Sequence, residues 1–206
     1  MHQVPQVEDS PELRSTLQRI SLALQADKAL FPEGADKAFF MIGALEAQVG
    51  GTELYLAAGG GSTYPAATGD WLQKKHLAHV DYRKGRWEVC HPGTPRRRDR
   101  WTTIAGYRTT LPADVHRSIR PCPAIRLLTR VGESNPGHEP IGRLRMGELV
   151  FIGKDVPLDD PDVRFAARRW QGDDTASSWT AHTCDPCNAA IPHLICTAAP
   201  DEFDPE

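Results

Sequence analysis

The sequence predicts an α+β fold: an N-terminal helix followed by a β-hairpin and by a mixed or antiparallel sheet with a few peripheral helices. Three observations support this class. Apolar residues recur at helical spacing near the start of the chain, and two strand-like runs then flank the turn signal Gly50-Gly51. The 206 residues also include 17 prolines and 17 glycines, which interrupt helices and so argue against a helical bundle.

The first helix is expected over residues 10–29. Ser10 can cap the amide groups of the first turn, Pro11 suits the first helical position, and Glu12 places a negative charge at the positive end of the helix dipole. One apolar face is formed by four residues spaced three or four apart, Leu13, Leu17, Ile20 and Leu24. This spacing predicts a helix that packs its apolar face on the core and has a structural role.

The hairpin is expected from residues 39–49 and 52–58, and glycine-rich residues 59–62 end it. Further strands are expected at residues 79–82, 86–90, 102–109, 124–131 and 144–153, and further helices at residues 65–78, 162–170 and 188–195. We expect a single domain over residues 1–206, with residues 1–9 and 199–206 as flexible termini.

Composition places the chain in the cytoplasm, or in an export route that leaves no N-terminal mark. No apolar run approaches the roughly 20 residues of a membrane helix, so no membrane partner is expected. The residues after Met1 show no signal peptide. The five cysteines are an odd number without a secretory signal, which favours reduced thiols or metal ligands over a disulfide framework.

Charge is distributed unevenly along the chain. Residues 83–130 hold twelve basic and three acidic residues, a formal charge of +9, whereas residues from 155 onward are rich in acids. The two parts could pair with each other, or the basic part could bind an anionic partner such as a nucleic acid or nucleotide. The expected contacts are Arg96, Arg97, Arg98 and Arg100, with Trp101 either stacking on a base or lying in the core.

A Cys-x-x-Cys pair, Cys184 and Cys187, is the sharpest motif. This spacing lets two thiolates reach one tetrahedral zinc ion. Cys90 or His91 is the expected third ligand, which leaves one position open, and His182 or Cys122 as a fourth ligand would close the site. A redox pair and two plain buried thiols are the alternatives.

These residues and their order resemble the zinc-dependent cytidine and nucleic-acid deaminase superfamily, including bacterial toxin deaminases. The similar features are the helix before the hairpin, the Gly-rich loop with Tyr64-Pro65 after it, the strand Trp87-Glu88-Val89-Cys90, and the Cys-x-x-Cys pair before a helix at 188–195. The resemblance implies a zinc-dependent hydrolase acting on a nucleobase, nucleotide or nucleic acid.

The chain departs from that family at the proton-carrying residue. The family places a glutamate two residues after a histidine or cysteine ligand, and no such His-x-Glu or Cys-x-Glu occurs here. Glu88 or Asp81 is therefore the expected substitute. The alternative function is a non-catalytic binding protein with a basic face, in which Cys184 and Cys187 hold a structural metal or are plain thiols.

Overall fold

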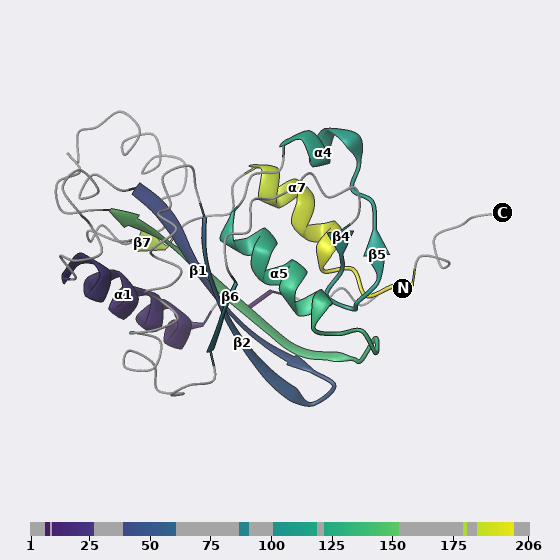
Figure 1. The fold of residues 1–206 in the computed structure, drawn as a ribbon, viewed down its shortest axis with the longest axis horizontal. Helices are drawn as coiled ribbons and strands as arrows, with labels where there is room; N and C mark the ends of the chain where they lie inside the picture. The colour runs from purple at the N-terminus through teal and green to yellow at the C-terminus, as the bar shows by residue number, and fades with distance from the viewer. Residues whose placement is uncertain are drawn as a thin grey trace.

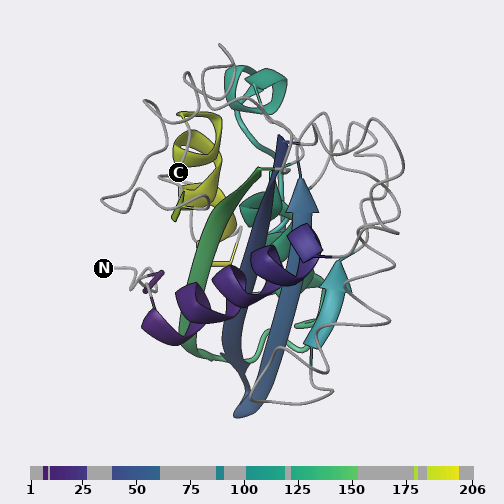
Figure 2. The ribbon, with the colours of Figure 1, turned by 90° about the vertical axis from the view of Figure 1, so that its left-hand side faces the viewer.

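The computed structural model describes residues 7–8, 10–26, 39–60, 87–90, 101–118, 122–152, 179–180 and 185–199. Their fold is of the mixed α+β class, as predicted, with a twisted sheet between two helical layers (Figure 1). Helix α1 (Pro11–Ala26) covers one face of the sheet, and helices α5 (Pro123–Glu133) and α7 (Asp185–Leu194) lie on the other (Figure 2).

The five-stranded sheet has the order β3-β2-β1-β6-β7. Its strands are β1 (Phe39–Val49), β2 (Thr52–Gly60), β3 (Trp87–Cys90), β6 (Ile141–Ile152) and β7 (Trp179–Thr180). Strand β1 pairs antiparallel with both β2 and β6, whereas β3 runs parallel to β2. The carboxyl ends of β2 and β3 therefore lie at the same end of the sheet as the first residues of β1.

Side chains alternate along the strands between two apolar clusters. Phe40, Ile42 and Ala44 of β1 pack with α1, and Leu45 and Ala47 pack on the opposite face with α5 and α7. The apolar face predicted for α1 is confirmed, because its four residues are at most 1% exposed. The predicted hairpin is also confirmed, and its second strand continues to Gly60.

Helix α5 replaces a predicted strand, so the prediction for residues 124–131 is wrong. Its valine, isoleucine and threonine residues are typical of strands. Ala124, Leu127, Leu128 and Val131 nevertheless fall at helical spacing and are buried on one face. Tertiary packing decides the outcome, since α5 lies directly over β1, where a Cβ built on Gly43 would come within 2.7 Å of the Pro123 Cβ.

The single strand predicted at residues 102–109 is also wrong. Two short strands, β4 (Trp101–Thr102) and β5 (Arg108–Thr109), form a hairpin whose turn contains Gly106 at a φ of 86°. Buried Asn135 ties this turn to the loop after α5. Its amide donates to the carbonyls of Ile104 and Glu139 at 3.1 and 2.9 Å and accepts from the Glu139 amide at 2.7 Å.

Three further elements agree with the sequence: the strands expected at 86–90 and 144–153 correspond to β3 and β6, and the helix expected at 188–195 corresponds to α7. The short helix α4 (Ala113–Ser118) and strand β7 were not anticipated. Residues 65–82 and 162–170 lie outside the described residues. Within the expected flexible N-terminus, Glu8 is hydrogen-bonded to the backbone of Leu144 and Met146.

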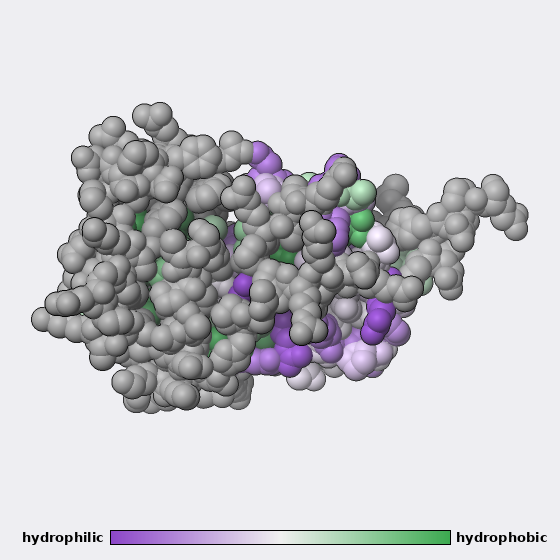
Figure 3. Space-filling model, turned by 45° about the horizontal axis from the view of Figure 1, so that its top comes forward, coloured by the Kyte–Doolittle hydropathy of each residue, from purple (hydrophilic) through white to green (hydrophobic). Residues whose placement is uncertain are grey.

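The surface made by the described residues is mostly hydrophilic in the view of Figure 3. Among these residues Leu22 is the large hydrophobic side chain that stands exposed, at 62%. None of the described helices is long and apolar enough to cross a membrane.

Candidate metal centre at the starts of two parallel helices

Helices α5 and α7 run side by side in the same direction (Figure 1). Their carboxyl ends meet the turn between β4 and β5: the Leu194 carbonyl accepts from the Ile104 amide at 2.8 Å, and Gly132 packs so closely on the Thr103 carbonyl that no Cβ would fit. The two helices have 11 and 10 residues, which makes each about 16 Å long. Because their lengths match, their first turns also lie toward the same end of this layer.

Each of these helices has a cysteine near its amino end. Cys122 is the N-cap of α5, with an extended backbone and no capping hydrogen bond from its side chain. Cys187 lies in the first turn of α7 and is 2% exposed. Both are thiols rather than disulfides. Cys184 comes directly before the first residue of α7 in the sequence but lies outside the described residues.

A carboxylate from the sheet reaches the start of α5. Glu148 on β6 is 7% exposed, and its Oε1 accepts a hydrogen bond of 3.1 Å from the Ala124 amide, two residues after Cys122. The first amides of a helix lack partners within it and lie at the positive end of its dipole, so a carboxylate is favourable there. Glu148 was not predicted as a site residue. The signal that could have indicated it is an acidic residue directly before the apolar residues 149–152, where a buried carboxylate is expected.

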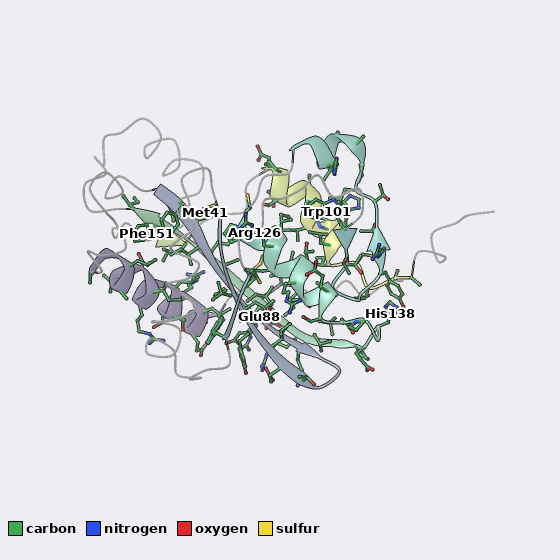
Figure 4. The ribbon with its side chains drawn as sticks, in the orientation of Figure 1. Met41, Glu88, Trp101, Arg126, His138 and Phe151 are labelled. Atoms are coloured by element: carbon green, nitrogen blue, oxygen red, sulfur yellow. The ribbon has the colours of Figure 1, made fainter. Side chains whose placement is uncertain are left out.

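Strand β3 presents Glu88 and Cys90 to the same layer. Val89 between them packs in the cluster under α1, so its two neighbours face α5. The Arg130 guanidinium donates through Nε to Glu88 Oε1 at 2.7 Å, and Arg126 donates to the Gly59 carbonyl at 3.1 Å. Glu88 and Arg126 are labelled in Figure 4. Since the side chains of Arg130 and Glu88 are 38% and 43% exposed, this ion pair stabilises the fold by about 1 kcal/mol at most.

The surroundings of Cys90 disfavour its thiolate. Burial, followed by the nearby charge of Glu88, raises the pKa of Cys90 to about 12. Zinc binds the thiolate, so ligation by Cys90 requires a deprotonation that costs on the order of 4 kcal/mol more than for an ordinary thiol. Cys122, the N-cap residue of α5, is a second candidate for the third thiol.

No family model, curated protein or solved structure matches the chain.

The residues predicted for the site divide into two groups. Cys90, Cys187, Glu88 and Trp101 are described, whereas Cys184, His91, Asp81, Arg96, Arg97, Arg98 and Arg100 lie outside the described residues. Within the described part of the chain, no three histidine, cysteine or acidic side chains gather into a metal cluster. A complete ligand set therefore needs at least one residue from the segments that flank the described elements, such as Cys184.

Trp101 is a core residue in this structure. It is 7% exposed and packs with Ile104, Leu111 and Val115 between the short hairpin and the helices (Figure 4). Stacking on a base needs an accessible ring face, so the expectation that Trp101 stacks on a base does not fit its burial.

Proposed function

We propose that the chain is a zinc-dependent hydrolase of the deaminase type that acts on a nucleobase, nucleotide or nucleic acid. The observation that carries the proposal is the parallel pair α5 and α7 on one face of the sheet, with Cys122 directly before α5 and Cys187 in the first turn of α7. Cys184 precedes Cys187 at the spacing that suits one tetrahedral ion.

The proposed ligands are Cys184, Cys187 and Cys122. Three protein ligands leave one position of a tetrahedral site open, which is the arrangement of catalytic zinc. A bound zinc ion would supply a water molecule of lowered pKa for attack on a ring carbon. Cys90 or His91 is the alternative third ligand, and the cost of ionising Cys90 counts against the former.

Proton transfer is proposed for a carboxylate on the α5 side of the sheet. Among the described strands, Glu88 and Glu148 are the glutamates that face this side. Glu88 is held by Arg130, which follows Cys122 by eight residues along α5, a rise of about 12 Å. Glu148, hydrogen-bonded to the first turn of α5, lies nearer the proposed ligands, and Asp81 remains the candidate from outside the described residues. A positioned acid-base group contributes about 10²–10⁴ in rate.

Substrate binding is proposed for the arginines of residues 96–100. In the described part of the basic segment, Arg126 and Arg130 are engaged by the Gly59 carbonyl and by Glu88, so they contribute to the fold. Four arginines in five positions offer a charge-dense contact for phosphate groups.

The alternative is a binding protein in which the thiols are structural. The burial of Cys187 favours it, because a side chain only 2% exposed within an apolar cluster is also what a plain core thiol looks like. Zinc content separates the proposal from plain thiols, and release of ammonia separates it from a structural metal.

The test is zinc content of protein purified and reconstituted under reducing conditions, together with ammonia release from cytidine and single-stranded DNA. The proposal predicts about one equivalent of zinc. Cys187→Ala and Cys122→Ala should lose it, and the matched control Cys196→Ala, a partly buried thiol beyond α7, should keep it. Loss of zinc in Cys90→Ala instead of Cys122→Ala would move the third ligand to β3, and wild-type protein without zinc would end the proposal.

A further inference from the structure

We propose that the stacked rings of Tyr107 and His138, the ring pair, form a docking site for a nucleobase whose adjoining phosphate is held by Arg108. This inference goes beyond the proposed hydrolase, because it requires neither zinc nor deamination. The ring pair lies past the carboxyl end of α5, whereas the proposed ligand Cys122 precedes this helix, which is about 16 Å long. In Figure 4, Arg126 and His138 accordingly lie toward opposite ends of α5.

Tyr107 and His138 lie face to face. Their ring centroids are 4.1 Å apart and their planes differ by 9°, so each ring uses one face for this contact. Tyr107 is half-buried and His138 is exposed, so the imidazole is the ring of the pair that faces solvent. Unpaired bases stack on the faces of tyrosine and histidine rings. A base on the outer face of His138 therefore extends a stack that the protein itself begins.

A backbone carbonyl fixes the orientation of the imidazole. His138 Nδ1 lies 2.8 Å from the Ala105 carbonyl oxygen. Because a carbonyl only accepts, Nδ1 carries a proton and donates it to this hydrogen bond. The contact with Tyr107 and this hydrogen bond together hold the plane of the ring, so a ligand does not have to order it. Preorganisation of this kind lowers the entropy that binding costs.

The backbone of His138 adopts an uncommon conformation. Its φ of 56° lies in the left-handed region, and it is the non-glycine residue with a positive φ in the described part of the chain. The His138 amide donates to the Asn135 carbonyl at 3.3 Å, and Gly106 packs so closely on that carbonyl that no Cβ would fit. Backbone conformations of this kind cluster at functional sites. Glycine would meet the same requirement without strain, which favours a role for the side chain itself.

Arg108 supplies a positive charge beside the ring pair. It directly follows the tyrosine, is exposed, and makes no hydrogen bond or ion pair with the described residues. The nearest carboxylates in the sequence of the adjoining loop are directed elsewhere. Glu133 pairs with an arginine of α5 at 3.8 Å, and the Glu139 side chain lies against Gly50 at the hairpin tip. A guanidinium in this setting suits a phosphate group, so the ring face and Arg108 together fit one nucleotide unit.

The test is binding of a fluorescein-labelled single-stranded oligoadenylate, followed by fluorescence anisotropy at low salt, with an abasic strand of the same length in parallel. His138→Asn removes the ring, and asparagine tolerates the left-handed backbone. This variant should bind the oligoadenylate about fivefold more weakly or worse and the abasic strand as wild type does. The matched control His193→Asn removes an imidazole of α7 that stacks on no described ring, and it should change neither affinity.

Two more variants separate the parts of the docking site. Tyr107→Leu removes the inner ring without touching the left-handed residue, and it should reproduce the loss seen in His138→Asn. Arg108→Ala should weaken binding of both strands by the same factor. It should also lower the slope of log affinity against log salt by about 0.7, the contribution of one phosphate contact in a single strand. Thermal unfolding of each variant shows that the fold is kept.

Each outcome decides the inference. Wild-type affinity for the oligoadenylate in both His138→Asn and Tyr107→Leu would overturn it, and so would a loss that the abasic strand shares. AMP is the second probe: AMP binding that depends on His138 indicates a free nucleotide, and binding of the oligoadenylate alone indicates a strand. Wild-type protein that binds neither probe would also overturn the inference. Because no readout involves zinc or ammonia, this inference and the proposed function stand or fall separately.

Discussion

Removal of the Asn135 side chain tests how the ends of α5 and α7 are held. This amide is 1% exposed and makes three hydrogen bonds that join the β4–β5 turn to the loop after α5. Asn135→Ala leaves the Ile104 carbonyl and both backbone groups of Glu139 without these partners. Each unsatisfied buried group costs about 1–3 kcal/mol, and Glu139 is exposed enough for water to replace part of the loss. We therefore expect a destabilisation of about 2–4 kcal/mol.

Thermal unfolding followed by circular dichroism measures this effect. For a chain of 206 residues, 2–4 kcal/mol corresponds to a fall in Tm of about 5–15 °C. Gln18→Ala on the exposed side of α1 is the control and should change stability by about 0.5 kcal/mol or less. A midpoint for Asn135→Ala within about 1 °C of wild type would refute the reasoning. A normal midpoint would mean that Asn135 does not hold the two helix ends together.

Three further perturbations address other contacts. Gly43→Ala places a Cβ against the first turn of α5 and should cost about 1–3 kcal/mol in urea unfolding, whereas Gly137→Ala meets only ordinary contacts and should be neutral. In zinc-free protein, alkylation of Cys90 should be slow at neutral pH, and Glu88→Gln should speed it by removing a charge that raises the Cys90 pKa. Cys90 stays protonated in the folded state up to about pH 12, so its contribution to stability is constant below pH 9 and falls between pH 9 and 12. Replacement of the four arginines in residues 96–100 by alanine should abolish retention on single-stranded DNA at low salt, and unchanged retention would show that they are only solvated.

Local signals predicted the first part of the fold. The cap at Ser10, the spacing of the apolar residues after it and the Gly50-Gly51 turn act over a few residues, and α1 and the hairpin formed as expected. The error at α5 has a tertiary cause, because its helical form depends on contacts with β1 that lie some 80 residues away in sequence. The parallel pairing of β3 with β2 is likewise non-local, and no spacing rule predicts it.

The candidate site divides in the same way. The Cys-x-x-Cys spacing is local and was visible in the sequence. The parallel arrangement of α5 and α7 depends on where the two helices end against one turn, and the contact of Glu148 with α5 depends on the register of β6. From the sequence, Cys122 was predicted only as a possible fourth ligand that would close the site.

X-ray absorption at the zinc edge tests the central claim most directly, because it counts the sulfur atoms around the ion. The account predicts three sulfurs at about 2.3 Å and one lighter atom at about 2.0 Å, which fits three thiolates with an open position taken by water. Cys122→Ala should reduce the sulfur count or release the metal. A shell of four protein ligands, or a wild-type protein that takes up no zinc, would contradict the account.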